Sequence, residues 1–195
     1  ERGAVQSALA QGWRLGFSAG TDSHDGRPGS VHDLDPSCTA NFADTDNDGL
    51  LDTPRCHDYT GGLTGVLHIG ALDREALFAG LRARNTVATS GPKAPLRVAA
   101  LGADGEIYLP GDDLPDAAMP ATLQLELDAA LEEAAATLDG VDVIDAGGQV
   151  IAVIEEGSAS MELDLAEGEL VYLRVRVTWQ ENEHRLWVSP FFAEE

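Results

Sequence analysis

Asp22 and His24 are the first residues whose types and spacing suit catalysis. They lie two positions apart in GTDSHDGRPG, directly after the apolar run LGFSA. Side chains two apart in an extended strand point to the same face, so this carboxylate and imidazole would project together. Both donor types suit Zn²⁺, Mn²⁺ or Fe²⁺, and Arg27 in the following turn could reach an anionic substrate group. Taken alone, the pattern is a weak signal and more often marks a solvated loop with a capping aspartate.

A second acidic stretch, DTDNDGLLD, begins at Asp44 and predicts a different metal. Alternating oxygen ligands followed by a glycine are the first half of a calcium loop. The expected ligands are Asp44, Asp46, Asp48, the Leu50 carbonyl and Asp52. Arg55 stands where an EF-hand requires glutamate, so the stretch instead resembles thrombospondin type 3 or dockerin-type loops of secreted proteins. We expect it to bind Ca²⁺ in a structural role; the alternative is a solvated acidic loop.

Two cysteines, Cys38 and Cys56, flank this acidic stretch. A disulfide between them would close a loop of about 19 residues and contribute roughly 3 kcal/mol through chain entropy. The polar, turn-rich surroundings favour the disulfide over two unrelated buried thiols, because free thiols there would be exposed. A disulfide implies an oxidising compartment, so we expect an extracellular or periplasmic protein.

The charge balance narrows the class of partner. The chain of 195 residues has 34 acidic and 12 basic residues, a formal net charge of −22. Nucleic acids and anionic membranes would repel such a surface, whereas metal cations would be attracted to it. No apolar run reaches the roughly 18 residues that a membrane span requires. We therefore expect metal ions as partners, with no nucleic acid and no membrane span.

The pattern of apolar and polar residues changes near Gly91 and Pro92. Before them, a helix at the N-terminus, a buried strand over RLGFSAG, a strand over LTGVLHIG and a helix over LDREALFAGLRARN predict an α/β layer. This part, residues 1–91, would carry the acidic and cysteine-containing insertion at 30–60. Residues 92–195 contain several short alternating segments separated by turns, which predicts an antiparallel β-sandwich, with LEEAAATL as a short helical crossover.

Several segments of residues 1–91 occur in the same order as, and resemble, motifs at the end of the PHP (polymerase and histidinol phosphatase) superfamily. The matching segments are Thr21 to His24, Gly61 to Thr64, Leu72 to Leu77 and Thr86 to Gly91. The resemblance implies a distorted β/α barrel holding a cluster of two or three metals, with Asp22 and His24 as the final ligands. It thus predicts an α+β chain in which a C-terminal fragment of a PHP-type barrel precedes the β-sandwich.

The sequence departs from this family in one respect. The family's earlier ligands, an H-x-H pair and further His and Glu residues, are absent before Asp22, and His32, His57, His68 and His184 lie in no matching motif. Two ligands are too few for a catalytic ion. We therefore expect the C-terminal part of a metal-dependent phosphoesterase, inactive by itself and completed by a missing N-terminal part of the barrel. The alternative is a non-catalytic, calcium-stabilised extracellular β-sandwich binding module.

Overall fold

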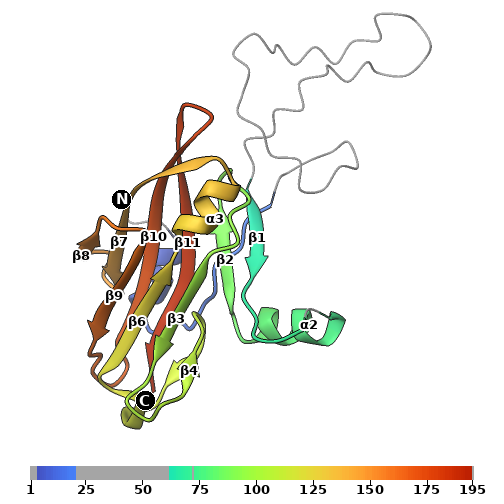
Figure 1. The fold of residues 1–195 in the computed structure, drawn as a ribbon. Helices are drawn as coiled ribbons and strands as arrows, with labels where there is room; N and C mark the ends of the chain where they lie inside the picture. The colour runs from blue at the N-terminus through green and yellow to red at the C-terminus, as the bar shows by residue number, and fades with distance from the viewer. Residues whose placement is uncertain (1–3, 21–61, 72, 195) are drawn as a thin grey trace, which may run out of the picture.

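Two mostly antiparallel sheets face each other in a computed structural model that describes residues 4–20, 62–71 and 73–194 (Figure 1). The large sheet contains, in spatial order, β1 (Leu63–Val66), β2 (Thr86–Thr89), β11 (Asn182–Ala193), β10 (Leu170–Trp179), β7 (Ala136–Asp145) and β8 (Val150–Ile154), and β5 (Asp113–Leu114) pairs with β11. The small sheet contains β4 (Ile107–Tyr108), β3 (Arg97–Leu101), β6 (Ala121–Glu126) and β9 (Ser158–Leu163). The helices are α1 (Ala4–Leu9), α2 (Arg74–Arg82), α3 (Asp128–Glu133) and the short 3-10 helix η1 (Asp116–Ala118).

The main core lies between the two sheets and follows from the alternation within each strand. In β10, Leu173 and Val175 are fully buried in this core. Tyr172 and Arg174 alternate with them and therefore lie on the opposite, outer face of the large sheet. Leu123 of β6 supplies the facing layer from the small sheet. This arrangement confirms the expected β-sandwich-like architecture.

The expected α+β fold with a fragment of a β/α barrel is wrong: among the described residues no such fragment is evident. β1 and β2 flank α2 in sequence, but they pair antiparallel, and β2 also pairs antiparallel with β11 of the sandwich. A β/α barrel requires parallel strands. The strand–helix–strand pattern misled because the same alternation also arises when a helix merely extends the connection between antiparallel neighbours.

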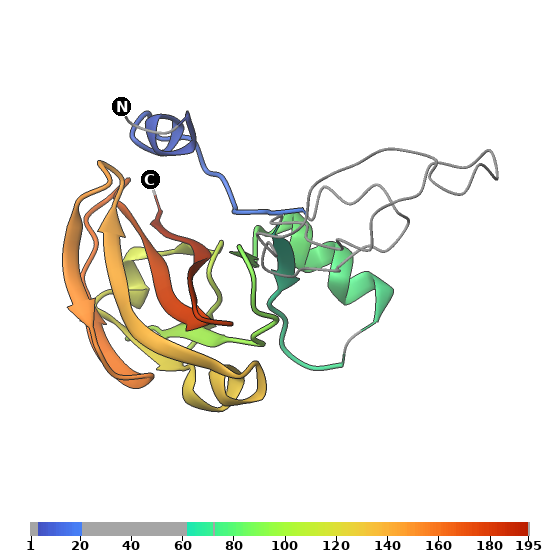
Figure 2. The same cartoon turned by 90° about the horizontal axis from the view of Figure 1, so that it is seen from above.

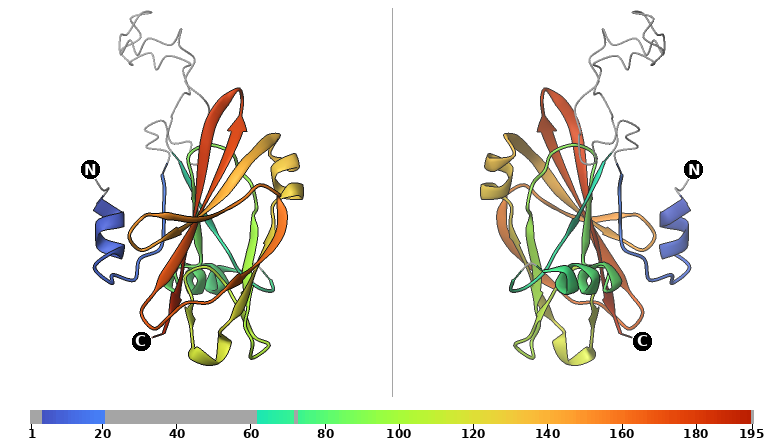
Figure 3. Two further views of the ribbon diagram at one scale, coloured as in Figure 1. Left: turned by 90° about the vertical axis from the view of Figure 1, so that its left-hand side faces the viewer. Right: turned by 90° about the vertical axis from the view of Figure 1, so that its right-hand side faces the viewer.

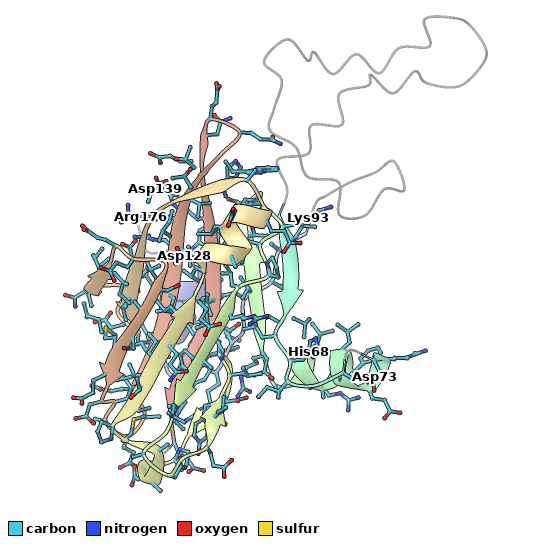
Figure 4. All side chains as sticks on the ribbon, viewed as in Figure 1. His68, Asp73, Lys93, Asp128, Asp139 and Arg176 are labelled. Carbon is cyan, nitrogen blue, oxygen red and sulfur yellow. The ribbon has the colours of Figure 1, made fainter. Side chains whose placement is uncertain are left out.

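Helix α2 projects away from the sandwich (Figure 1). Most of its apolar residues are exposed. The Asp73 carboxylate caps its N-terminus by accepting a hydrogen bond from the Ala76 N–H at 2.8 Å. Of the described residues in α2, only Gly80 is buried. Leu77, Phe78 and Leu81 are all exposed, although an amphipathic helix normally buries such a face. Figure 4 shows Asp73 and His68 together on this projecting arm.

Candidate functional site

The segment that precedes the Asp22 motif is fixed to the large sheet by side-chain hydroxyls. The Phe17 N–H donates to Ser189 Oγ at 2.9 Å, and Thr86 Oγ1 donates to the Phe17 carbonyl at 2.7 Å. The Thr64 hydroxyl both accepts from the Ala19 N–H and donates to its carbonyl, each at 2.8 Å. Residues 14–20 therefore form no strand, contrary to the prediction, because hydroxyl groups take the place of a neighbouring backbone.

The two ends of segment 21–61 meet at a pair of glycines. The Gly62 N–H donates to the Gly20 carbonyl at 2.8 Å. Gly62 is buried, and a Cβ atom there would lie 2.6 Å from the Ala19 Cβ and collide with the Thr89 carbonyl oxygen. Only glycine permits this approach of three backbones. The chain thus enters the Asp22 motif from a point held tightly against β1 and β2.

The predicted site residues themselves lie outside the described residues. They are Asp22, His24 and Arg27 of the motif, Cys38 and Cys56, and the calcium-loop residues Asp44, Asp46, Asp48, Leu50 and Asp52. Their roles and the disulfide therefore stay predictions. Within residues 4–20, 62–71 and 73–194, no group of three or more His, Cys, Asp or Glu could hold a metal ion.

Two of the histidines can be placed. His68 follows β1, and its buried Nδ1 has no hydrogen-bond partner among the described residues. His184 is buried on β11, with Nδ1 3.1 Å from the Ser90 carbonyl oxygen and its ring edge-on to Trp179. Neither residue belongs to a cluster of metal-ligating side chains in the described part of the chain.

Chelation tests the predicted calcium loop. EDTA is expected to increase proteolytic cleavage between Cys38 and Cys56, because four carboxylates in so short a stretch repel one another without a cation. Limited proteolysis with mass spectrometry locates the cuts, and added Ca²⁺ should reverse the effect. Cleavage that EDTA leaves unchanged would contradict the calcium assignment.

An ion-pair cluster on the outer face of the large sheet was missed in the sequence. The buried Asp142 carboxylate accepts from Arg174 Nε at 2.9 Å through Oδ2 and from Arg176 Nε at 3.2 Å through Oδ1. Arg174 Nη2 lies 2.7 Å from the same Oδ2. The alternation in LVYLRVRVTW puts both arginines on one face, and an aspartate inside the apolar run GVDVI was the available signal for their partner.

No family model, curated protein or solved structure matches the chain. In the ranges that the structure describes, no helix is long and apolar enough to cross a membrane.

Proposed function

We propose that this chain supplies Asp22 and His24 as the last two metal ligands of a PHP-type, metal-dependent phosphoesterase. The proposal concerns the site and its motifs, not a barrel fold for residues 1–91. When bound, the metal would lower the pKa of a coordinated water and polarise the phosphate ester. Arg27 would orient the phosphate through its fork of N–H donors. One observation carries the proposal: the motifs that resemble this family follow one another in the family's order. The chain on either side of the Asp22 motif is joined by the hydrogen bond between Gly62 and Gly20.

The remaining metal ligands would come from polypeptide outside this chain. Catalytic zinc sites commonly use three protein ligands and one water, so Asp22 and His24 do not suffice. The exposed apolar side chains of α2, Leu77, Phe78 and Leu81, support this proposal, because they offer a surface that further polypeptide would cover.

Calorimetric titration with Mn²⁺ tests the two-ligand site, with Ca²⁺ present to fill the acidic loop. The chain is expected to bind Mn²⁺ more weakly than micromolar, and His24→Ala or Asp22→Asn should remove that binding. Asp116→Asn, a change to an exposed carboxylate on η1, is the matched control and should have no effect. Sub-micromolar binding that His24→Ala abolishes would contradict the incomplete site. An identical titration in both motif variants would exclude the motif from metal binding.

The second candidate is a calcium-stabilised extracellular binding module whose working part is the β-sandwich. The spacing of oxygen ligands in DTDNDGLLD favours it. The gene distinguishes the two candidates: an H-x-H strand encoded upstream supports the phosphoesterase, whereas an adhesion-type domain there supports the module.

A further inference from the structure

A groove of about 510 Å³ lies on the outer face of the large sheet, beneath α1. Val5 and Gln6 of α1 line one side, and Phe17, in the stretch 14–20 that hydroxyl groups hold to the sheet, lines another. Figures 2 and 3 show α1 and the chain that follows it standing over this face of the sheet. The volume lies within the range typical of small-molecule sites.

Strand register builds the floor of the groove. Arg174 of β10 lies opposite Trp187 of β11, and Trp187 lies opposite Ala88 of β2. Tyr172 precedes Arg174 by two residues and shares its face. The Phe17 ring packs edge-on against the Tyr172 ring, with centroids 5.3 Å apart. The small Ala88 side chain lies beside these aromatic rings. The groove therefore has flat apolar surfaces and space for the ring of a ligand.

Two side chains on this floor, Tyr172 and Arg174, carry hydrogen-bond donors that have no partner among the described residues. Tyr172 is only 8% exposed; its hydroxyl is not among the fully buried unpartnered atoms, and it makes no hydrogen bond to the described residues. Burial raises the pKa of the Tyr172 phenol, so it stays a protonated donor at neutral pH. Arg174 commits two of its five N–H donors to Asp142 and leaves three without a partner in the described part of the chain.

The charge of the lining contrasts with that of the whole protein. Among the described residues no Asp or Glu lines the groove, although the chain has 34 acidic residues, and Arg174 is the one charged residue of this described lining. Asp142 offsets part of the Arg174 charge from the side. The described lining therefore presents donors and apolar surface, with the nearby Asp145 charge adding to the raised pKa of Tyr172 from outside the lining. This combination complements a single small anion with an apolar body.

We propose that this groove binds a small monocarboxylate with a flat, apolar ring. The carboxylate accepts hydrogen bonds from Arg174 and the Tyr172 hydroxyl, and the ring packs against Trp187 and Phe17. One partly neutralised guanidinium and one neutral phenol suit a single negative charge better than a phosphate dianion. The site needs no metal, so it is independent of the proposed phosphoesterase function.

Titration calorimetry with 3-phenylpropionate tests the site, with its primary amide and 3-phenylpropylamine as matched ligands. The carboxylate is expected to bind, the amide at least about tenfold more weakly, and the amine not at all, because hydrogen bonds to a charged group are the stronger ones. Tyr172→Phe should weaken carboxylate binding about tenfold while keeping the ring and the fold.

Tyr108→Phe is the control variant. The Tyr108 hydroxyl donates to Asp104 Oδ2 at 2.7 Å, which raises the pKa of Tyr108 to about 12, and Tyr108 does not line the groove. Carboxylate affinity should be unchanged in this variant. The proposal is overturned if millimolar carboxylate gives no binding heat, if the amide binds as tightly, or if Tyr172→Phe binds like the wild type. All readouts are taken with EDTA present, so failure here leaves the metal-site proposal untouched.

Discussion

Replacing Gly62 with alanine is expected to lower the free energy of unfolding by about 2 to 3 kcal/mol, the upper part of the range for overpacking. The new Cβ would collide with the Thr89 carbonyl oxygen and lie 2.6 Å from the Ala19 Cβ. Neither neighbour can yield easily, because Thr89 belongs to β2 and Ala19 is held by the Thr64 hydroxyl. Relief requires segment 15–20 to leave the sheet, so the variant should also expose Phe17.

Gly65→Ala provides the matched control for this substitution. Gly65 lies in the same strand, and a Cβ there would meet only the Val87 carbonyl oxygen at an ordinary 3.8 Å. Urea unfolding followed by tryptophan fluorescence should show a lower midpoint for Gly62→Ala and a midpoint close to wild type for Gly65→Ala. Equal midpoints for the two variants would contradict the tight approach of Gly62 to Ala19 and Thr89.

Asp142→Asn is expected to cost about 2 kcal/mol of folding free energy. Each carboxylate oxygen accepts from a different arginine, so the amide nitrogen would place one donor against another. The change also removes the only negative charge that pairs with Arg174 and Arg176 within the described residues. Because the two arginine side chains are 33% and 38% exposed, solvent limits the loss to less than that of a fully buried pair.

Glu126→Gln tests the same change in an exposed ion pair. Arg97 and Glu126 lie 3.6 Å apart, with side chains 82% and 70% exposed. Solvent screens such a pair, so thermal or urea unfolding should shift by less than about 0.5 kcal/mol. An Asp142→Asn effect no larger than that of Glu126→Gln would contradict a structural role for the arginine–aspartate–arginine cluster.

Local patterns in the sequence predicted individual helices and strands better than they predicted which strands pair with each other. The apolar spacing indicated helix α2, and alternation indicated the strands of the sandwich. Strand direction was not encoded in the same way, because LTGV and TVAT look alike in parallel and antiparallel pairing. The pairing of β2 with β11 joins residues about 100 positions apart, and only the packed structure reveals it.

The surroundings of the candidate sites were predictable only in part. Asp22 and His24 stood out by residue type and spacing, but nothing in the sequence showed that Ser189, Thr86 and Thr64 hold the preceding segment. A hydroxyl that bonds a distant backbone has no local signature. The groove beneath α1 was hidden for the same reason, since Tyr172, Trp187 and Ala88 meet only through strand register.

Hydrolysis of p-nitrophenyl phosphate by the full-length gene product containing this chain tests the metal-site proposal most directly. Loss of a ligand removes several kcal/mol of metal-derived stabilisation of the transition state. Mn²⁺-dependent turnover should therefore fall about 100-fold or more in Asp22→Asn and in His24→Ala, and stay unchanged in Asp116→Asn. Metal-dependent turnover that both motif variants retain in full would contradict the proposed role of Asp22 and His24.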